Sequence, residues 1–121
     1  METINYCGKT YKVFKLKVYG TTFRIFFVKD AYRLGNTLAV RVMDIEDGYV
    51  EDFAVATVKL DTPDEKNNFA YADTNNCGWL LDFVRSNGLA KETGRSAPSG
   101  WCVYPLLEWL PEKFESDGSA A

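Results

Sequence analysis

Residues 73–105 constrain the fold most, because they place strong turn signals on both sides of one short amphipathic helix. The predicted helix covers about residues 76–87 and follows polar side chains that can accept hydrogen bonds from its unpaired N–H groups. Asn87 and Gly88 favour the left-handed backbone that ends many helices, with Leu89 folding back onto the last turn. Three apolar residues share one face of this helix: Leu80, Phe83 and Val84. The chain therefore contains one helix that must pack on another element.

Most of the remaining sequence alternates apolar and polar residues with the period of two that a β-strand requires. The segment TFRIFFV at 22–28 is aromatic and β-branched enough to be the core strand. Asp47 and Gly48 mark a hairpin turn, and Pro105 requires an edge, a bulge or a strand end. The predicted strands cover residues 3–6, 10–18, 22–28, 37–44, 53–60, 69–72 and 101–109. We expect an α+β fold, with a curved antiparallel sheet of five or six strands packed on one main helix.

A chain of 121 residues has the size of one domain, and no internal repeat divides it. We predict a single domain over residues 1–115 and a flexible tail of small polar residues at 116–121. No apolar run reaches the roughly 18 residues that a membrane-spanning helix needs. The first residues also lack the apolar segment of a signal peptide. We therefore expect a cytoplasmic protein without membrane contact.

Histidine is absent from this chain and cysteine is rare, which limits the enzyme and metal sites it can form. It has no histidine, which excludes histidine-based triads and imidazole metal ligands. Its three cysteines are an odd number without C-x-x-C spacing, so we expect free, mostly buried thiols in a reducing compartment. We predict a non-enzymatic protein without catalytic residues, metal or cofactor. An enzyme that depends on Cys77 or Cys102 is the least favoured interpretation.

The net charge of −3 conceals a strong segregation of charge along the chain. Residues 1–43 carry eight Lys or Arg against two acids, whereas residues 44–121 carry six against fifteen. One interpretation is that alternating strands simply have a solvated charged face. The other is a dipolar surface that docks on a charged partner.

A cluster of acids surrounds the predicted hairpin turn and gives the main candidate for a partner-binding surface. Its carboxylates lack the ordered spacing of a calcium-binding loop. They are therefore either solvated loop charges or an acidic edge that engages a basic groove on a partner. A tyrosine within the cluster could anchor the contact, as could Tyr32 or Trp109. The candidate partner-binding residues are Asp44, Glu46, Asp47, Tyr49, Glu51 and Asp52.

Lysines interleaved with aromatic residues in the N-terminal strands form an alternative binding surface. Lys12, Lys15 and Lys17 could contact phosphates while neighbouring aromatic rings stack on bases. The negative net charge of the chain weakens this hypothesis, because it opposes long-range attraction to a polyanion.

Two turn-rich segments have both a structural and a ligand-binding interpretation. Residues 73–76 bring four polar side chains to the start of the helix, where we favour capping over a ligand site. Residues 93–100 resemble an anion-binding loop only faintly and lack the spacing of a phosphate loop. We expect this second segment to be a loop that crosses the helix and orders the final strand.

Several short motifs occur together along the chain. They are I-x-Y-x-G-K-T-Y at 4–11, G-N-x-L-A-V at 35–40, T-V-x-L at 57–60, D-T-N-N at 73–76, N-G-L at 87–89, T-G at 93–94 and S-G-W-C-x-Y-P at 99–105. From Ile4 to Trp109 the chain resembles an uncharacterised domain-of-unknown-function family of small proteins from plasmids, conjugative elements and phages of Gram-positive and gut bacteria. Trp101 stands where phenylalanine is commoner, and the extension from Leu110 is expected to be particular to this chain.

The resemblance implies an accessory protein of a mobile element and supplies no catalytic residues. Small accessory proteins of such elements often antagonise host defence. The resemblance therefore also implies an anti-CRISPR protein that binds and inhibits a Cas9-type effector nuclease or its ribonucleoprotein. The alternative is a nucleic-acid-binding accessory factor of a mobile element that uses the basic N-terminal strands.

Overall fold

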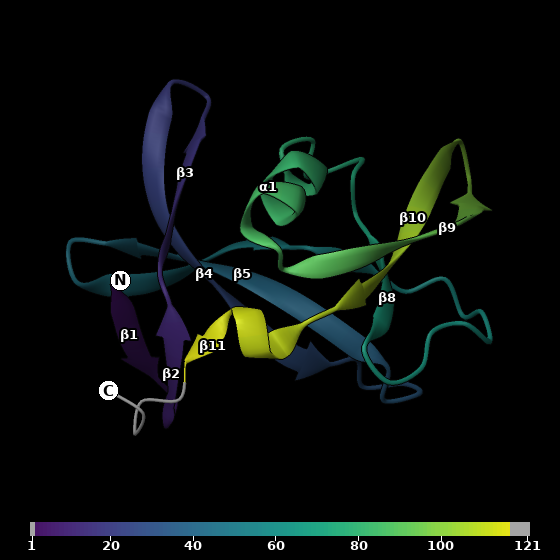
Figure 1. Cartoon of the computed structure of the whole chain (residues 1–121), viewed down its shortest axis with the longest axis horizontal. Coiled ribbons are helices and arrows are strands. Elements are labelled where there is room, and N and C mark those ends of the chain that lie inside the picture. Colours follow the sequence, from purple (N-terminus) through teal and green to yellow (C-terminus); the bar gives the residue numbers. More distant parts are fainter. Residues whose placement is uncertain (1, 117–121) are drawn as a thin grey trace.

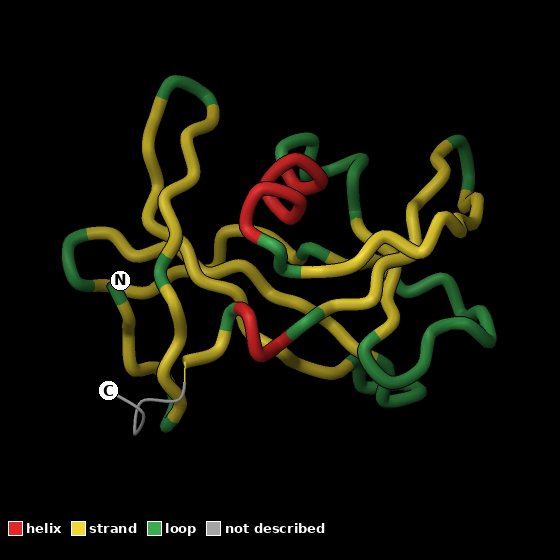
Figure 2. The backbone as a smooth tube through the Cα atoms, in the orientation of Figure 1, coloured by secondary structure: helices red, strands yellow, loops and turns green. Residues whose placement is uncertain are grey.

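Within residues 2–116, three antiparallel sheets and one α-helix make up the fold (Figures 1 and 2). The computed structural model describes residues 2–116. The α+β class is confirmed, because strands dominate this part of the chain and its one α-helix is α1 (Leu80–Asn87). The expected single curved sheet is wrong, because the strands divide among three separate hydrogen-bonded sets.

The central sheet has four strands in the order β3-β4-β5-β6. Their bounds are β3 Phe14–Val18, β4 Thr21–Ala31, β5 Leu38–Glu46 and β6 Tyr49–Val55. Four consecutive β4 residues, from Ile25 to Val28, are all buried, although neighbouring side chains on a strand point to opposite faces. Both faces are therefore covered in the middle of this sheet, which explains the continuous apolar run in the sequence.

The second sheet has the order β7-β8-β10-β9. Its strands are β7 Thr57–Val58, β8 Phe69–Ala72, β9 Ala90–Ser99 and β10 Cys102–Trp109. The prediction of a loop at 93–100 is wrong, since residues 93–99 belong to strand β9, of which Ser96–Ser99 and Ala90–Glu92 pair with β10. Most β9 side chains are exposed, so the sequence shows no apolar alternation there. The β-bulge interpretation of Pro105 is confirmed by a register shift between Pro105 and Leu107.

The third sheet is small and brings distant parts of the chain together. Its order is β1-β2-β11, with β1 Thr3–Tyr6, β2 Lys9–Lys12 and β11 Glu115–Ser116. The strand expected over residues 10–18 is interrupted at Val13, whose N–H donates to the Glu2 carbonyl at 2.9 Å. Its two parts, β2 and β3, belong to different sheets. Ser116 pairs with Thr10, and the rest of the predicted tail lies outside the described residues.

The helix α1 begins later than the sequence predicts, at Leu80. The Asp73 carboxylate accepts hydrogen bonds from Asn76, at 3.1 Å from the backbone N and 2.9 Å from Nδ2. These bonds stabilise a turn before the helix, so the capping expected at the helix N-terminus itself is wrong. The predicted end is confirmed, since Gly88 has φ 64° and the Leu89 N–H donates to the Val84 carbonyl at 3.1 Å.

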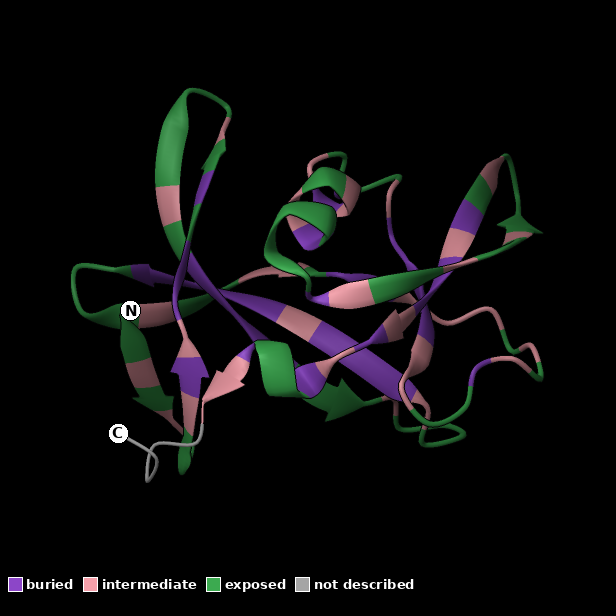
Figure 3. Cartoon of the chain, viewed as in Figure 1, coloured by how far each residue is buried: buried purple, intermediate pink, exposed green. Residues whose placement is uncertain are grey.

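The main core lies between the central sheet and a layer formed by α1 and the second sheet (Figure 3). The central sheet contributes alternate residues such as Phe27, and α1 contributes Leu80 and Val84. Trp109 is completely buried there, and its indole N–H donates to the Ala70 carbonyl at 3.3 Å. A smaller cluster on the opposite face of the central sheet packs under the third sheet.

The short 3-10 helix η1 (Pro111–Lys113) connects β10 to β11. Phe114 follows it and is completely buried against Phe27, with ring centroids 5.9 Å apart. This contact joins the C-terminal part of the described chain to the main core.

Candidate partner-binding surfaces

The acidic candidate surface lies at the end of the β5–β6 hairpin. Asp47 and Gly48 form its two-residue turn, and both have positive φ, 51° and 82°. This geometry matches the twist of paired strands and sets Glu46 opposite Tyr49 across the hairpin. Glu46, Asp47, Tyr49 and Glu51 are exposed. We call these four residues the acidic tip.

Asp44 does not belong to this exposed surface, contrary to the prediction. Only 8% of the residue is accessible, because β5 alternation places it on the core face, between Ile25 of β4 and Glu51 of β6. Burial raises the pKa of the Asp44 carboxyl, and the negative charge of Glu51 raises it further. Asp44 is therefore a buried acid at the edge of the core, and it is not accessible to a partner.

Asp52 is exposed, but its charge is offset within the chain. Its carboxylate lies 2.6 Å from Nη2 of Arg41, which also approaches Asp30 at 3.6 Å through Nη1. The hydrogen bond to Asp52 raises the pKa of the Arg41 guanidinium. The structure thus reduces the six predicted partner-binding residues to the acidic tip and a neutralised neighbour.

Only one of the three aromatic anchors named from the sequence is fully exposed. Tyr49 is exposed as expected, with 73% of its surface accessible. The prediction that Trp109 is exposed is wrong, because its side chain is completely buried in the core. Tyr32 is half-buried, with its hydroxyl 3.1 Å from the Thr57 carbonyl oxygen and 3.0 Å from the Thr57 hydroxyl.

Two exposed aromatic residues are not among the partner anchors named from the sequence. Tyr19 is 79% exposed at the β3–β4 turn, and Trp101 is fully exposed at the β9–β10 turn. Each adjoins a glycine with positive φ, Gly20 or Gly100. An aromatic residue beside a turn glycine is the signal that would have found them, since a turn projects its side chains into solvent.

The structure separates the three lysines of the alternative surface. Lys12 lies in β2 of the third sheet, whereas Lys15 and Lys17 are exposed on β3 of the central sheet. Lys15 stands opposite Arg24, whose guanidinium pairs with Glu2. The predicted continuous basic row is therefore divided between two sheets.

Comparison with known protein families finds one that matches most of this chain. Residues 28–116 match the family described as a domain of unknown function, DUF4313. The chain belongs to the DUF4313 family. The expected resemblance to such a family is confirmed, although the match begins at 28 instead of Ile4. It also includes residues 110–116, so the expectation that the extension from Leu110 is particular to this chain is wrong. No curated protein and no solved structure matches the chain.

The three cysteines of this DUF4313 protein are free thiols with different exposure. Cys7 is exposed, Cys102 is half-buried and Cys77 is buried, so the expectation of mostly buried thiols holds fully for one of them. Burial, followed by the nearby charge of Asp73, raises the pKa of Cys77 to about 11. Cys77 is thus protonated at neutral pH and unsuited to act as a nucleophile.

Residues 2–116 of the DUF4313 protein meet the requirements of neither a metal-ligand cluster nor a membrane-spanning helix. Its Cys, Asp and Glu side chains form no group of three or more that could bind a metal ion in that range. No helix in the same range combines the length and apolar character required to cross a membrane.

Proposed function

We propose that this protein is a non-enzymatic accessory protein that binds a partner through the acidic tip. The observation that carries the proposal is the concentration of exposed charge on one hairpin. Glu46, Asp47 and Glu51 are exposed on the same hairpin as Tyr49, and Glu46 stands directly opposite it. None of the ion pairs among residues 2–116 involves these three carboxylates.

An exposed aromatic ring among unpaired carboxylates suits a basic surface on a nucleic-acid-binding protein. The carboxylates would take the positions of phosphates, and Tyr49 would supply an apolar anchor. In the cytoplasm of a bacterial host, the proposed target of this mobile-element protein is a CRISPR effector of the Cas9 type. Such effectors hold their guide–target duplex in a positively charged channel. Occupying that channel would inhibit the nuclease without any chemical step.

The test is inhibition of plasmid cleavage by a Cas9-type nuclease loaded with its guide RNA. The variant Glu46→Gln/Asp47→Asn/Glu51→Gln removes the three free charges of the acidic tip. We expect at least about tenfold weaker inhibition, because electrostatic attraction governs how fast such surfaces associate. A control, Asp61→Asn/Asp82→Asn/Glu112→Gln, removes the same number of carboxylate charges from exposed positions elsewhere, two of which form ion pairs with Lys59 and Arg85. Equal inhibition by both variants would reject the acidic tip, and no inhibition by the unmodified protein would reject this target.

A second candidate function is nucleic-acid binding through β3. Lys15 and Lys17 are exposed next to Tyr19, which gives two phosphate contacts and one stacking surface. If this function is correct, the isolated protein shifts labelled RNA or DNA in a salt-dependent manner, and the shift is lost in Lys12→Ala/Lys15→Ala/Lys17→Ala. Absence of any shift at low salt would exclude it.

A further inference from the structure

In the described part of the chain, residues 2–116, the outer edge of strand β3 has no neighbouring strand. β3 is the terminal strand of the central sheet and pairs with β4 alone. The turn between Val18 and Thr21 has two residues, both with positive φ (53° and 73°). In such a hairpin the residues that flank the turn form a hydrogen-bonded pair, and such pairs alternate along the ladder. Leu16 therefore bonds to β4, whereas the N–H and C=O groups of Lys15 and Lys17 point away from β4.

A neighbouring bond supports this assignment of the outward groups. Val13 precedes Lys15 by two positions and lies on the same alternation, and its N–H donates to the Glu2 carbonyl at 2.9 Å. No backbone partner beyond the central sheet occurs for Lys15 or Lys17 among residues 2–116. The outer edge of this part of the chain is therefore paired at Val13, whereas its backbone groups at Lys15 and Lys17 are unpaired among residues 2–116.

This open edge faces a groove formed with helix α1. The groove has a volume of about 430 Å³ and lies between Lys15–Val18 of β3 and one side of the helix region. Figure 1 shows β3 and α1 on the two sides of this space. The residues that line its helix side are Trp79, Asp82, Phe83, Ser86 and Asn87.

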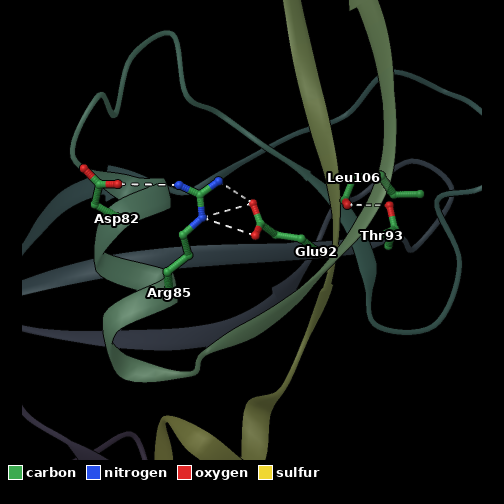
Figure 4. Close-up of polar contacts among 5 residues, drawn as sticks. All are labelled: Asp82, Arg85, Glu92, Thr93 and Leu106. Carbon is green, nitrogen blue, oxygen red and sulfur yellow. Dashed lines mark hydrogen bonds and ion pairs between the residues drawn. The ribbon is translucent and has the colours of Figure 1, made fainter.

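The helix side of the groove is partly apolar, and side-chain contacts connect the helix to strand β9. Trp79 and Phe83 are half-buried, and their rings meet edge to face with centroids 5.8 Å apart. On another side of the helix, Arg85 binds Glu92 of β9 through two guanidinium nitrogens, at 2.7 and 3.2 Å (Figure 4). Arg85 also lies 3.6 Å from Asp82, which offsets the one acid in the groove lining. The groove therefore has an apolar wall at the helix, and the one acid in its lining is already paired.

The lysine charges of β3 and the alternation of its side chains indicate which residues an added strand would carry. Lys15 and Lys17 project from the face of the central sheet opposite Leu16, and no ion pair among residues 2–116 involves either lysine. A strand added beside β3 would place alternate side chains next to these lysines and the others against Trp79 and Phe83. The first set would be acidic and the second apolar.

We infer that the β3–α1 groove binds an extended segment of a partner protein, in which acidic and apolar residues alternate, as an added fifth strand of the central sheet. The main-chain bonds would come from Lys15 and Lys17, and selectivity from their ammonium groups and the two aromatic rings. This site is separate from the acidic tip and goes beyond the function proposed above. Its strand side, Lys15–Val18, lies entirely before residue 28 and so outside the family match.

The test uses fluorescence anisotropy with labelled nine-residue peptides and the whole chain. One peptide alternates Glu with Leu or Val, a second replaces Glu by Lys, and a third has the composition of the first with its residues grouped in blocks. We expect the alternating acidic peptide to bind at least about tenfold more tightly than either of the others. N-methylation of one alternate set of its amides should abolish binding, whereas N-methylation of the other set should not, because only one set faces the β3 edge.

A pair of variants tests the protein side. Lys17→Pro removes both the ammonium group and the outward N–H, whereas Lys17→Ala removes only the ammonium group. We expect Lys17→Ala to weaken binding severalfold and Lys17→Pro to abolish it, while the β3–β4 ladder is kept because that N–H lies outside it. If Lys17→Pro fails to fold, the N-methylated peptides with the unmodified chain decide the question.

Several outcomes would overturn the inference. Equal binding of the Glu and Lys peptides would remove the charge argument, and equal effects of both N-methylation patterns would exclude strand addition. A self-associated chain that becomes monomeric in Lys17→Ala would show that a second copy fills the groove. Displacement of the acidic peptide by single-stranded RNA but not by the grouped peptide would favour nucleic acid as the natural occupant.

Discussion

At the scale of single residues, Asp44 occupies an energetically unfavourable position. Its side chain is buried directly opposite Glu51, and like charges across a strand pair are destabilising. Because the pKa of Asp44 is raised, the unfolded chain loses this proton at a lower pH than the folded chain does. Stability therefore falls as pH rises through this range, and the penalty is complete at neutral pH.

Replacing Asp44 by asparagine should consequently stabilise the protein. We expect Asp44→Asn to raise the free energy of unfolding by about 0.5 kcal/mol at pH 7, with the gain disappearing in acid, where both proteins are uncharged at this position. Urea unfolding at both pH values measures this change. Asp47→Asn is the matched control, since it removes a charge from the same hairpin at an exposed turn position. A destabilised Asp44→Asn at neutral pH would contradict the argument.

The buried thiol of Cys77 should be far less reactive than the exposed thiol of Cys7. Raising a thiol pKa from 9.0 to about 11 lowers the thiolate fraction at a given pH about hundredfold. In Cys7→Ser/Cys102→Ser, where Cys77 is the remaining thiol, we expect labelling by a disulfide reagent only as fast as the protein opens. The thiolate absorbance of the same variant should rise near pH 11. Rapid labelling without denaturant, at the rate of a Cys7-only variant, would show that the thiol is accessible.

The same thiol makes stability depend on alkaline pH. Cys77 ionises more easily in the unfolded chain than in the folded one, so its contribution to stability is complete below pH 9.0 and is lost as pH rises toward 11. Comparing the unmodified protein with Cys77→Ala over this range isolates the effect from other ionising groups.

At the scale of elements, the end of α1 shows what local sequence can determine. Asn87, Gly88 and Leu89 specify a left-handed helix end through backbone sterics alone, and the structure contains it. The start of α1 was not predictable to the residue, because Asp73 and Asn76 are equally able to cap a helix or to close a turn. Strand β9 was missed since its stabilisation comes from pairing with β10 and not from an apolar face.

A substitution at the helix end should expose this backbone requirement. Gly88→Ala should lower the free energy of unfolding by about 1 kcal/mol, because Gly88 has φ 64° and a side chain is disfavoured there. Gly78 offers a matched control, since it lies at the other end of α1 and an added Cβ meets nothing within 4 Å at either position. Thermal or urea unfolding should place Gly78→Ala close to the unmodified protein. Equal losses in both variants would show that the φ angle is not the cause.

At the scale of the whole molecule, charge and burial decide which sequence expectations survive. The acidic tip was predictable, because a two-residue turn exposes its flanking residues. Asp44 and Trp109 were misplaced since their position depends on how sheets pack, which no local pattern reports. The separation of Lys12 from Lys15 and Lys17 likewise follows from the chain changing sheets at Val13.

The burial of Phe114 provides a test of this packing. Phe114→Ala should lower the free energy of unfolding by about 3–5 kcal/mol, because a completely buried ring leaves a cavity next to Phe27. Trp101→Ala removes an even larger aromatic ring from a fully exposed position, and we expect a change within about 0.5 kcal/mol. Urea unfolding of the two variants measures the difference. A small effect at Phe114 would mean that the segment after β10 is not part of the core.

The third sheet has a consequence for how the protein is made. β2 is paired on one side with β1 and on the other with β11, and Lys9 meets Glu115 although the two are 106 positions apart. During synthesis the early strands emerge from the ribosome long before β11 does. A nascent chain must therefore keep one side of β2 open until nearly all of these residues have been translated, and a stalled chain would offer that strand to aggregation or to proteases.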